Sequence, residues 1–203
     1  MYYFFLLSYT ILGAGIKYID AAYDDKVFSK KIALIIAPVL GILWAYTMVI
    51  NQVSATILLA ILLGVFLKGK IDNYAHLAGF LIILAIIFLL GVQLMIVPLI
   101  LLATAALLDE IGNDLIDKYK ERLNKNSYSH KFVVKFFDHR WVMKIAILWL
   151  AIMSVIPILF FLAMVLFDYS YLGVRLYSQF RQGTLSLKTP LKIQISRRPS
   201  LDA

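Results

Sequence analysis

The chain has 203 residues, of which 62% are hydrophobic and 16% charged, with no cysteine and a formal charge of +8. Soluble domains are about 45–50% apolar. This composition, with a mean hydropathy of +0.85, therefore excludes an ordinary soluble globule, a disordered chain and a disulfide-stapled secreted scaffold. An integral membrane protein of at most about six or seven spans remains.

Apolar runs without charge follow one another along the chain, and the longest, residues 77–108, has room for two short helices. Gly91 and Gln93 predict a turn near its middle; one helix kinked at Pro98 is the competing interpretation. The first run has no basic start, so we interpret it as a span and not as a signal peptide. We predict an all-α, polytopic integral membrane bundle of about six transmembrane helices in one domain, residues 1–167. The expected spans are residues 1–16, 32–50, 51–67, 77–91, 94–108 and 145–167.

The basic residues are distributed very unevenly between the predicted loops. Fourteen of the 20 lie in residues 17–31, 68–70 and 118–144, whereas the turns at 51–54 and 92–93 have none. Cytoplasmic loops of membrane proteins are enriched in Lys and Arg. We therefore expect a multi-pass cell-membrane protein with its N-terminus outside and the three charged loops in the cytoplasm. The Ile- and Lys-rich, cysteine-free composition suggests a prokaryotic source.

The C-terminal segment, residues 168–203, does not fit this orientation. It holds the other six basic residues, yet six spans would place it outside. Either it is exported despite its charge, or residues 145–167 turn back at Pro157 as a hairpin, or an earlier span is miscounted. Apolar spacing predicts an interfacial helix over residues 168–182 and a strand-like tail beyond Gly183. Such a tail is a candidate contact for a partner subunit or a second copy.

Ten of the twelve acidic residues lie in the three loops between predicted spans that also hold the fourteen basic residues, at 17–31, 68–76 and 109–144. They form clusters that each follow or precede a predicted span. Several pairs are four residues apart and would share one face of a helix. Carboxylates in this arrangement suit Mg²⁺, which prefers oxygen ligands and is often shared with substrate phosphates. The clusters are Asp20, Asp24 and Asp25; Asp72, Asn73 and His76; and Asp109, Glu110, Asn113, Asp114 and Asp117.

These clusters predict an acidic site at the cytoplasmic ends of the helices, although a solvated rim of charges is the ordinary alternative. The expected catalytic residues are Asp20, Asp24, Asp109 and Asp114. The expected Mg²⁺ ligands are Asp20, Asp24, Asp72, Asp109 and Asp114. Lys17, Lys68, Lys70 and His76 are expected to bind a phosphorylated substrate.

The basic stretch 127–144 has aromatic and aliphatic residues at helical spacing, which predicts an amphipathic helix on anionic lipid headgroups. Nucleic-acid binding is not expected, because these aromatic residues suit the membrane surface. The sequence contains no Walker loop, nucleophile elbow or zinc-protease motif.

The acidic clusters on a helical bundle resemble, in layout alone, the UbiA-type intramembrane prenyltransferases, whose Asp-rich motifs bind Mg²⁺-diphosphate. The segment from Asp20 to Asp25 lacks their Asn-Asp-x-x-Asp pattern, and the chain is short for their nine spans. CDP-alcohol phosphotransferases have six spans and an acidic site, but their Asp-Gly…Ala-Arg…Gly…Asp…Asp signature is missing. The sequence is assigned to neither family.

The leading hypothesis is a Mg²⁺-dependent transferase that acts on a phosphorylated or prenylated lipid at the cytoplasmic face. A carrier or channel for a small solute or ion is the first alternative. The absence of ionisable residues within the predicted spans argues against it. A structural membrane subunit without catalytic activity is the second alternative.

Overall fold

The computed structural model describes residues 2–69, 73–119 and 128–183, and every regular element in these ranges is a helix. Lys70, Asp72 and the strand-like tail at 184–203 lie outside the described residues. The helices are α1 (Tyr2–Tyr23), α2 (Lys30–Val49), α3 (Gln52–Leu67), α4 (Tyr74–Leu90), α5 (Ile96–Tyr119), α6 (Tyr128–Asp138), α7 (Trp141–Ile152) and α8 (Ile158–Arg181).

The long apolar run 77–108 forms two helices, as predicted. Helix α4 ends at Leu90 and is followed by Gly91, whose φ of +70° lies in the region that glycine tolerates best. Pro98 stands in the first turn of α5, where its missing N–H costs no helical hydrogen bond. The competing interpretation, one helix kinked at Pro98, is therefore wrong.

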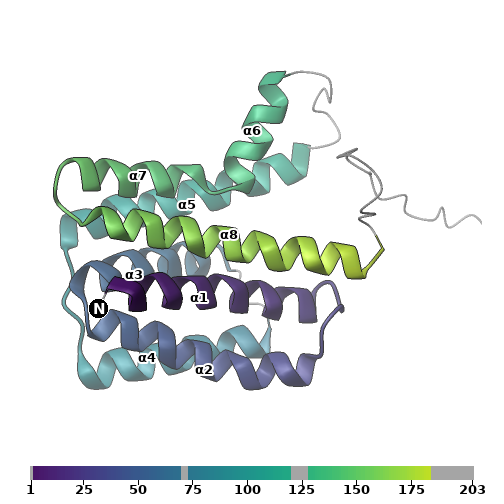
Figure 1. The fold of residues 1–203 in the computed structure, drawn as a ribbon, viewed down its shortest axis with the longest axis horizontal. Coiled ribbons are helices and arrows are strands. Elements are labelled where there is room, and N and C mark those ends of the chain that lie inside the picture. Colours follow the sequence, from purple (N-terminus) through teal and green to yellow (C-terminus); the bar gives the residue numbers. More distant parts are fainter. Residues whose placement is uncertain (1, 70–72, 120–127, 184–203) are drawn as a thin grey trace, which may run out of the picture.

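The predicted span 145–167 is not one helix. Helix α7 ends at Ile152, and the chain reverses over residues 153–157, with Ser154 at a φ of +57° and Pro157 as the N-cap of α8. Proline has no amide hydrogen to continue the preceding helix, which is why α7 cannot run on through it. The separate helix predicted over 168–182 is instead the second half of α8. The hairpin alternative is thus the one that the structure adopts (Figure 1).

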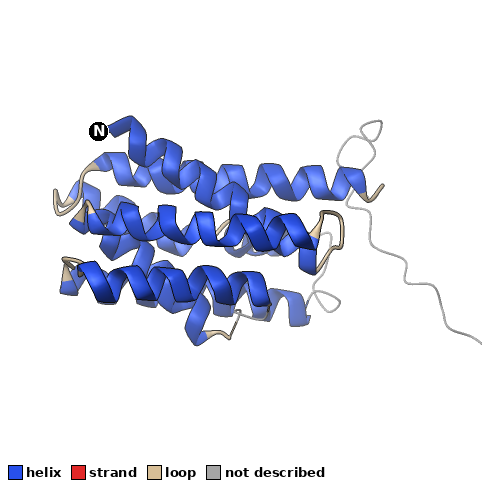
Figure 2. Ribbon diagram, turned by 90° about the horizontal axis from the view of Figure 1, so that it is seen from below, coloured by secondary structure: helices blue, strands red, loops and turns tan. Residues whose placement is uncertain are grey.

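Three pairs of non-consecutive helices make the closest contacts of the bundle: α1 with α8, α2 with α4, and α3 with α5. Within each pair the two helices run in the same direction (Figure 1). Small residues allow the close approach: a Cβ on Gly13 would lie 2.0 Å from the carbonyl oxygen of Phe167, and one on Gly41 would lie 2.7 Å from that of Gly79. Figure 2 shows that the bundle is built of long helices lying side by side, with short turns at their ends.

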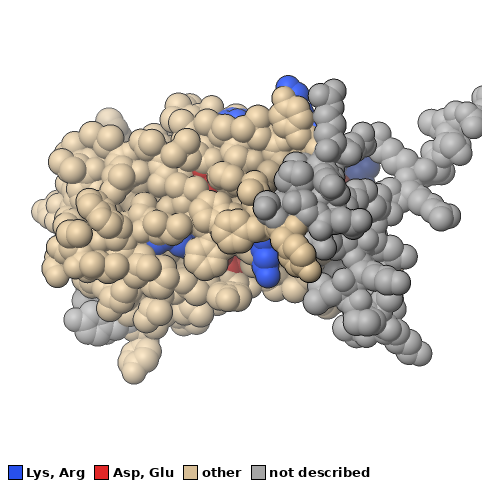
Figure 3. Space-filling model, turned by 90° about the horizontal axis from the view of Figure 1, so that it is seen from above, with Lys and Arg blue, Asp and Glu red and all other residues tan. Residues whose placement is uncertain are grey.

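Four helices are long and apolar enough to cross a membrane: residues 3–23, 30–49, 96–116 and 158–181. Helices α3, α4 and α7 are apolar but shorter. Many large apolar side chains are exposed on the outside of the bundle, among them Ile35, Phe88 and Ile152. Figure 3 shows one face of the molecule on which few charged side chains reach the surface. Such a surface is typical of a protein that faces lipid.

The charged residues gather at one end of the bundle. The last turns of α1, α3, α5 and α8 and the first turns of α2 and α4 lie at this end, on the right in Figure 1, which we call the charged end. The opposite turns, residues 50–51, 91–95 and 153–157, contain no Lys, Arg, Asp, Glu or His. The acidic clusters that the structure describes are therefore close in space although they are distant in sequence.

Candidate functional site

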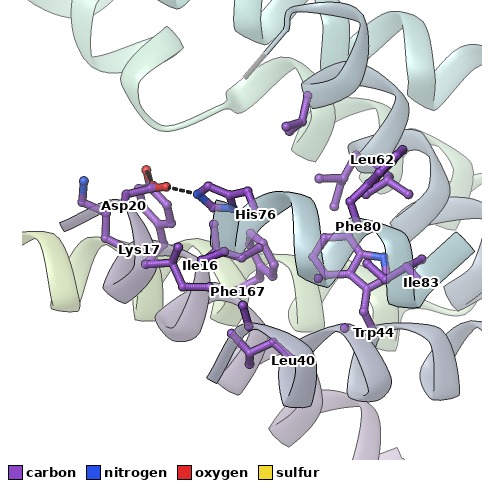
Figure 4. Close-up of a pocket in the computed structure, with 18 of the residues that line it drawn as sticks. Ile16, Lys17, Asp20, Leu40, Trp44, Leu62, His76, Phe80, Ile83 and Phe167 are labelled. Atoms are coloured by element: carbon purple, nitrogen blue, oxygen red, sulfur yellow. Dashed lines mark hydrogen bonds and ion pairs between the residues drawn. The ribbon is translucent and has the colours of Figure 1, made fainter. Parts of the chain in front are cut away.

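A cavity of about 410 Å³ extends from the charged end into the bundle between α1, α2, α3, α4, α5 and α8. This volume is within the range of small-molecule sites. Charged and polar side chains line the part nearest the charged end, and apolar and aromatic side chains line the rest (Figure 4). The polar lining consists of Lys17, Asp20, Asp24, His76, Glu110, Asn113, Arg140 and Tyr171. The apolar lining includes Ile16, Leu40, Trp44, Leu62, Phe80, Ile83 and Phe167.

Asp20 is the centre of the polar part. Its Oδ1 lies 2.8 Å from Nε2 of His76, and its Oδ2 accepts a hydrogen bond of 3.0 Å from the hydroxyl of Tyr171. Asn73 caps α4 by accepting from the backbone N–H of His76 at 2.9 Å, which holds the histidine at the start of that helix. A carboxylate that binds one ring nitrogen orients an imidazole, so this pair is able to hold or pass a proton.

Arg140 supplies the second charged contact of the cavity. The residue has a φ of +50°, in the left-handed region that arginine rarely adopts. Its Nη2 lies 3.2 Å from Oε1 of the buried Glu110, and its guanidinium lies 5.5 Å from the ring centre of Tyr171. Burial alone would lower the pKa of Arg140, but the Glu110 carboxylate, together with Tyr171, Asp168 and Asp20, outweighs this effect and raises the pKa. Arg140 is therefore cationic and held in place beside the cavity.

Lys17 and Asp24 complete the polar lining on the side of α1. The Nζ of Lys17 lies 5.6 Å from the ring centre of Tyr171 and 3.9 Å from Oδ2 of Asp25. Asp25 accepts a hydrogen bond from the hydroxyl of Ser178 in α8 and does not line the cavity. The first acidic cluster is thus divided: Asp20 and Asp24 face the cavity, and Asp25 ties α1 to α8.

Two of the predicted site residues have structural partners outside this cavity. Both carboxylate oxygens of Asp109 accept from backbone amides at the start of α7, from Val142 at 3.1 Å and from Met143 at 2.8 Å. The carboxylate satisfies donors that a helix start leaves unpaired. Asp114 lies 2.6 Å from the Nζ of Lys68, a contact that joins α5 to α3. Neither aspartate lines the cavity.

Among the residues that the structure describes, no three His, Asp or Glu side chains form a group suited to a metal ion. Asp72, one of the predicted ligands, is not among them. Mg²⁺ often takes only one or two protein carboxylates and fills its shell with water and substrate phosphate. The residues fit such an ion only if a phosphorylated substrate brings most of the ligands, and Mg²⁺ binding stays a prediction.

A buried ion pair lies between α7 and α8. The Nζ of Lys144 is 2.6 Å from Oδ2 of Asp168, and the two side chains are 8% and 9% exposed. Lys144 also donates to the carbonyl oxygen of His139. Asp168 comes directly after the predicted span 145–167, which combined α7 and the first half of α8 into one helix. In the structure this aspartate is in the middle of α8.

Spacing along the sequence identified Lys17, Asp20, Asp24 and His76 but missed Arg140 and Tyr171 as members of the same site. Arg140 was one of eight basic residues in a loop, and Tyr171 is separated from Asp20 by 151 positions. No local pattern distinguishes either residue from its neighbours. Their role follows from the α7–α8 hairpin, which brings the end of α8 back beside α1.

Comparisons of the chain with protein-family models, curated protein sequences and solved structures each find no match. The geometry of the cavity is therefore the basis for the function proposed below.

Proposed function

We propose that this protein is an integral membrane enzyme that binds the phosphorylated head of a lipid in the cavity and acts on it, as a transferase of the prenyl or phospholipid type. The observation that carries the proposal is the division of one cavity into an ionised part at the charged end and an apolar part inside the bundle. A lipid has the same division between headgroup and chain. Ligand sites of this kind are largely apolar, with a few polar groups that fix orientation.

In the proposed orientation the charged end faces the cytoplasm and the N-terminus lies outside. Basic residues are concentrated in the loops of the charged end, and the turns of the opposite end have none, which is the asymmetry of the positive-inside rule. Helices α1, α2, α5 and α8 cross the membrane in this arrangement. Helices α3 and α4, with 16 and 17 residues, are about 25 Å long and cross a locally thin bilayer.

The side chains around the cavity have complementary roles in this proposal. Arg140 and Lys17 bind the phosphate, since a guanidinium and an ammonium are the usual cationic partners of that group. Asp20 and His76 hold or transfer the proton at the reacting oxygen. Mg²⁺, where the reaction needs it, is held by Asp24 together with substrate phosphate oxygens and supplies charge neutralisation.

The test is turnover by the purified protein in lipid nanodiscs with a prenyl diphosphate and an acylglycerol phosphate, each with and without Mg²⁺. The Asp20→Asn variant keeps the shape of the side chain but removes its charge. We expect a loss of about 100-fold or more in turnover, as is usual when an acid–base group is removed. Asp114→Asn, at an aspartate that pairs with Lys68 outside the cavity, is the matched control and should retain turnover. Equal activity of both variants would contradict the assignment of Asp20.

The second candidate function is a carrier, and the buried Lys144–Asp168 pair is the observation that favours it. Ionisable residues inside apolar helices are rare and often mark an ion or proton pathway. Solute flux into liposomes that is lost in Asp168→Asn, without lipid turnover, would favour the carrier over the enzyme.

A further inference from the structure

The indole N–H of Trp44 has no hydrogen-bond partner among the described residues. The side chain is only 5% exposed, and it lines the inner, apolar part of the cavity. Buried polar groups in folded proteins nearly always have a partner, so each exception needs an explanation. Trp44 belongs to the apolar part of the cavity, whereas the residues that bind the phosphate in the proposed function, Lys17 and Arg140, belong to the polar part.

The surroundings of Trp44 contain no acceptor for this N–H. The ring of Trp44 packs edge-on against Phe167 at a centroid distance of 6.4 Å. From α2 the indole extends toward Phe80 and Ile83 of α4 (Figure 4). These are hydrocarbon side chains, and a hydrocarbon cannot accept a hydrogen bond from an indole N–H. The donor is therefore buried in the cavity wall without an acceptor among the described residues.

The depth of Trp44 follows from the packing of α2 on α4. Gly41 faces Gly79 across the contact of these helices, and both run in the same direction (Figure 1). Trp44 is three residues beyond Gly41, so it is level with Ile82, which is three residues beyond Gly79 and six beyond His76. At a rise of 1.5 Å per residue, Trp44 lies about 9 Å deeper in the bundle than His76.

We propose that the ligand of this cavity is an acylglycerol phosphate, whose phosphate binds at the charged part of the cavity and whose ester carbonyl accepts the indole N–H of Trp44. This inference rests on the proposed function and narrows its substrate class. A prenyl diphosphate has acceptors only in its head, and its hydrocarbon chain would leave Trp44 unsatisfied. An acylglycerol phosphate carries a second acceptor several bonds from the phosphate, at the boundary between head and chain.

The size of the cavity agrees with this ligand. At about 30 Å³ for each water-sized group, 410 Å³ holds about 14 such groups. That number is enough for the phosphate, the glycerol and the ester, but not for a whole acyl chain. In this proposal the rest of the chain leaves between α3 and α4, which are not a closely packed pair among the described residues. There Phe80 of the cavity wall stacks on the half-exposed Phe66 at 5.5 Å.

The experiment compares two amphiphiles that both carry a phosphate monoester and an 18-carbon chain, of which only one has the glycerol ester. The probes are 1-oleoyl-glycerol 3-phosphate and oleyl phosphate, and the full chain is used in nanodiscs of neutral lipid. Trp44→Phe removes the N–H and keeps an aromatic ring. Trp149→Phe, at an exposed position of α7, is the matched control. We expect Trp44→Phe to weaken binding of the acylglycerol phosphate about tenfold, the effect of one lost hydrogen bond, and to leave oleyl phosphate unchanged.

A second measurement observes the hydrogen bond directly. The chain has three tryptophans, so ¹⁵N-labelled tryptophan gives three indole N–H signals, and the Trp44→Phe variant assigns the one that disappears. That signal should move on addition of the acylglycerol phosphate and stay in place with oleyl phosphate.

The outcomes separate the inference from the function on which it rests. If neither amphiphile nor a prenyl diphosphate binds, the proposed function fails and the inference fails with it. If both amphiphiles bind but Trp44→Phe affects them equally, the cavity is a lipid site and the role of Trp44 is wrong. Tighter binding of a prenyl diphosphate than of the acylglycerol phosphate, unaffected by Trp44→Phe, would also overturn the inference while leaving the proposed function intact.

Discussion

Two ion pairs of the bundle have the same length and different burial, so together they test what burial contributes to stability. The Lys144–Asp168 and Lys68–Asp114 pairs are both 2.6 Å long, but their side chains are 8% and 9% exposed in the first and 24% and 48% in the second. Removal of one partner from a buried pair leaves an uncompensated charge and costs about 3–5 kcal/mol. An exposed pair contributes about 0–1 kcal/mol because water solvates and screens its charges.

We therefore expect Lys144→Met to lower the free energy of unfolding by about 3 kcal/mol or more. Lys68→Met should lower it by less than about 1 kcal/mol. The double variant Lys144→Met/Asp168→Leu removes both charges and should recover most of the loss, because two apolar side chains of similar volume often replace a buried pair at little cost.

Equilibrium unfolding in mixed detergent micelles, followed by circular dichroism, measures all four proteins under one condition. A double variant no more stable than Lys144→Met would show that the cost comes from packing and not from the unpaired charge. Equal costs for Lys144→Met and Lys68→Met would refute the argument from burial.

Two further predictions concern the contacts that hold the helices in place. Asp109→Ala removes the acceptor for two amides at the start of α7 and should cost about 1–2 kcal/mol in the same unfolding assay. Asp109→Asn should cost less, because its amide oxygen still accepts one bond; an equal loss would contradict the capping role. Gly13→Ala places a methyl group 2.0 Å from the carbonyl oxygen of Phe167 and should destabilise the bundle, whereas Gly173→Ala meets nothing within 4 Å and should not. Equal melting temperatures for the two alanine variants would rule out a tight α1–α8 contact.

The sequence predicted the helices well where charge and glycine mark their ends. Uncharged runs located α1 to α5, with charged loops after α1 and α3, and Gly91 divided the 77–108 run correctly. One helix over residues 145–167 was predicted before the hairpin at 153–157, because this run contains no charge. Hydropathy does not register a reversal that occurs entirely within an apolar run, and Pro157 is the one local signal of it.

The sequence predicted at which end of the bundle the acidic residues gather, but not which of them line the cavity. Charge clustering predicted that the ends of α1, α4 and α5 share one face, and the structure brings Asp20, His76 and Glu110 to the same cavity. It could not distinguish Asp20, which faces the cavity, from Asp109, which caps α7. Both are aspartates near the end of an apolar run, and the difference depends on which backbone amides lie beside each one. That information comes from the packing of α7, a long-range contact that spacing along the chain does not contain.

The hairpin also changes the direction in which the chain enters the C-terminal segment. With α7 and α8 as separate antiparallel helices, α8 ends at the charged end (Figure 1), and it carries Arg175 and Arg181, two of the last six basic residues of the sequence. A single helix over 145–167 would have sent them to the opposite side, against the positive-inside rule. The turn at 153–157 thus has two consequences: it directs the end of α8, with Arg181, to the charged end, and it places Tyr171 beside Asp20. One reversal of the chain near Pro157 therefore accounts both for the position of these α8 arginines and for the presence of Tyr171 in the cavity wall.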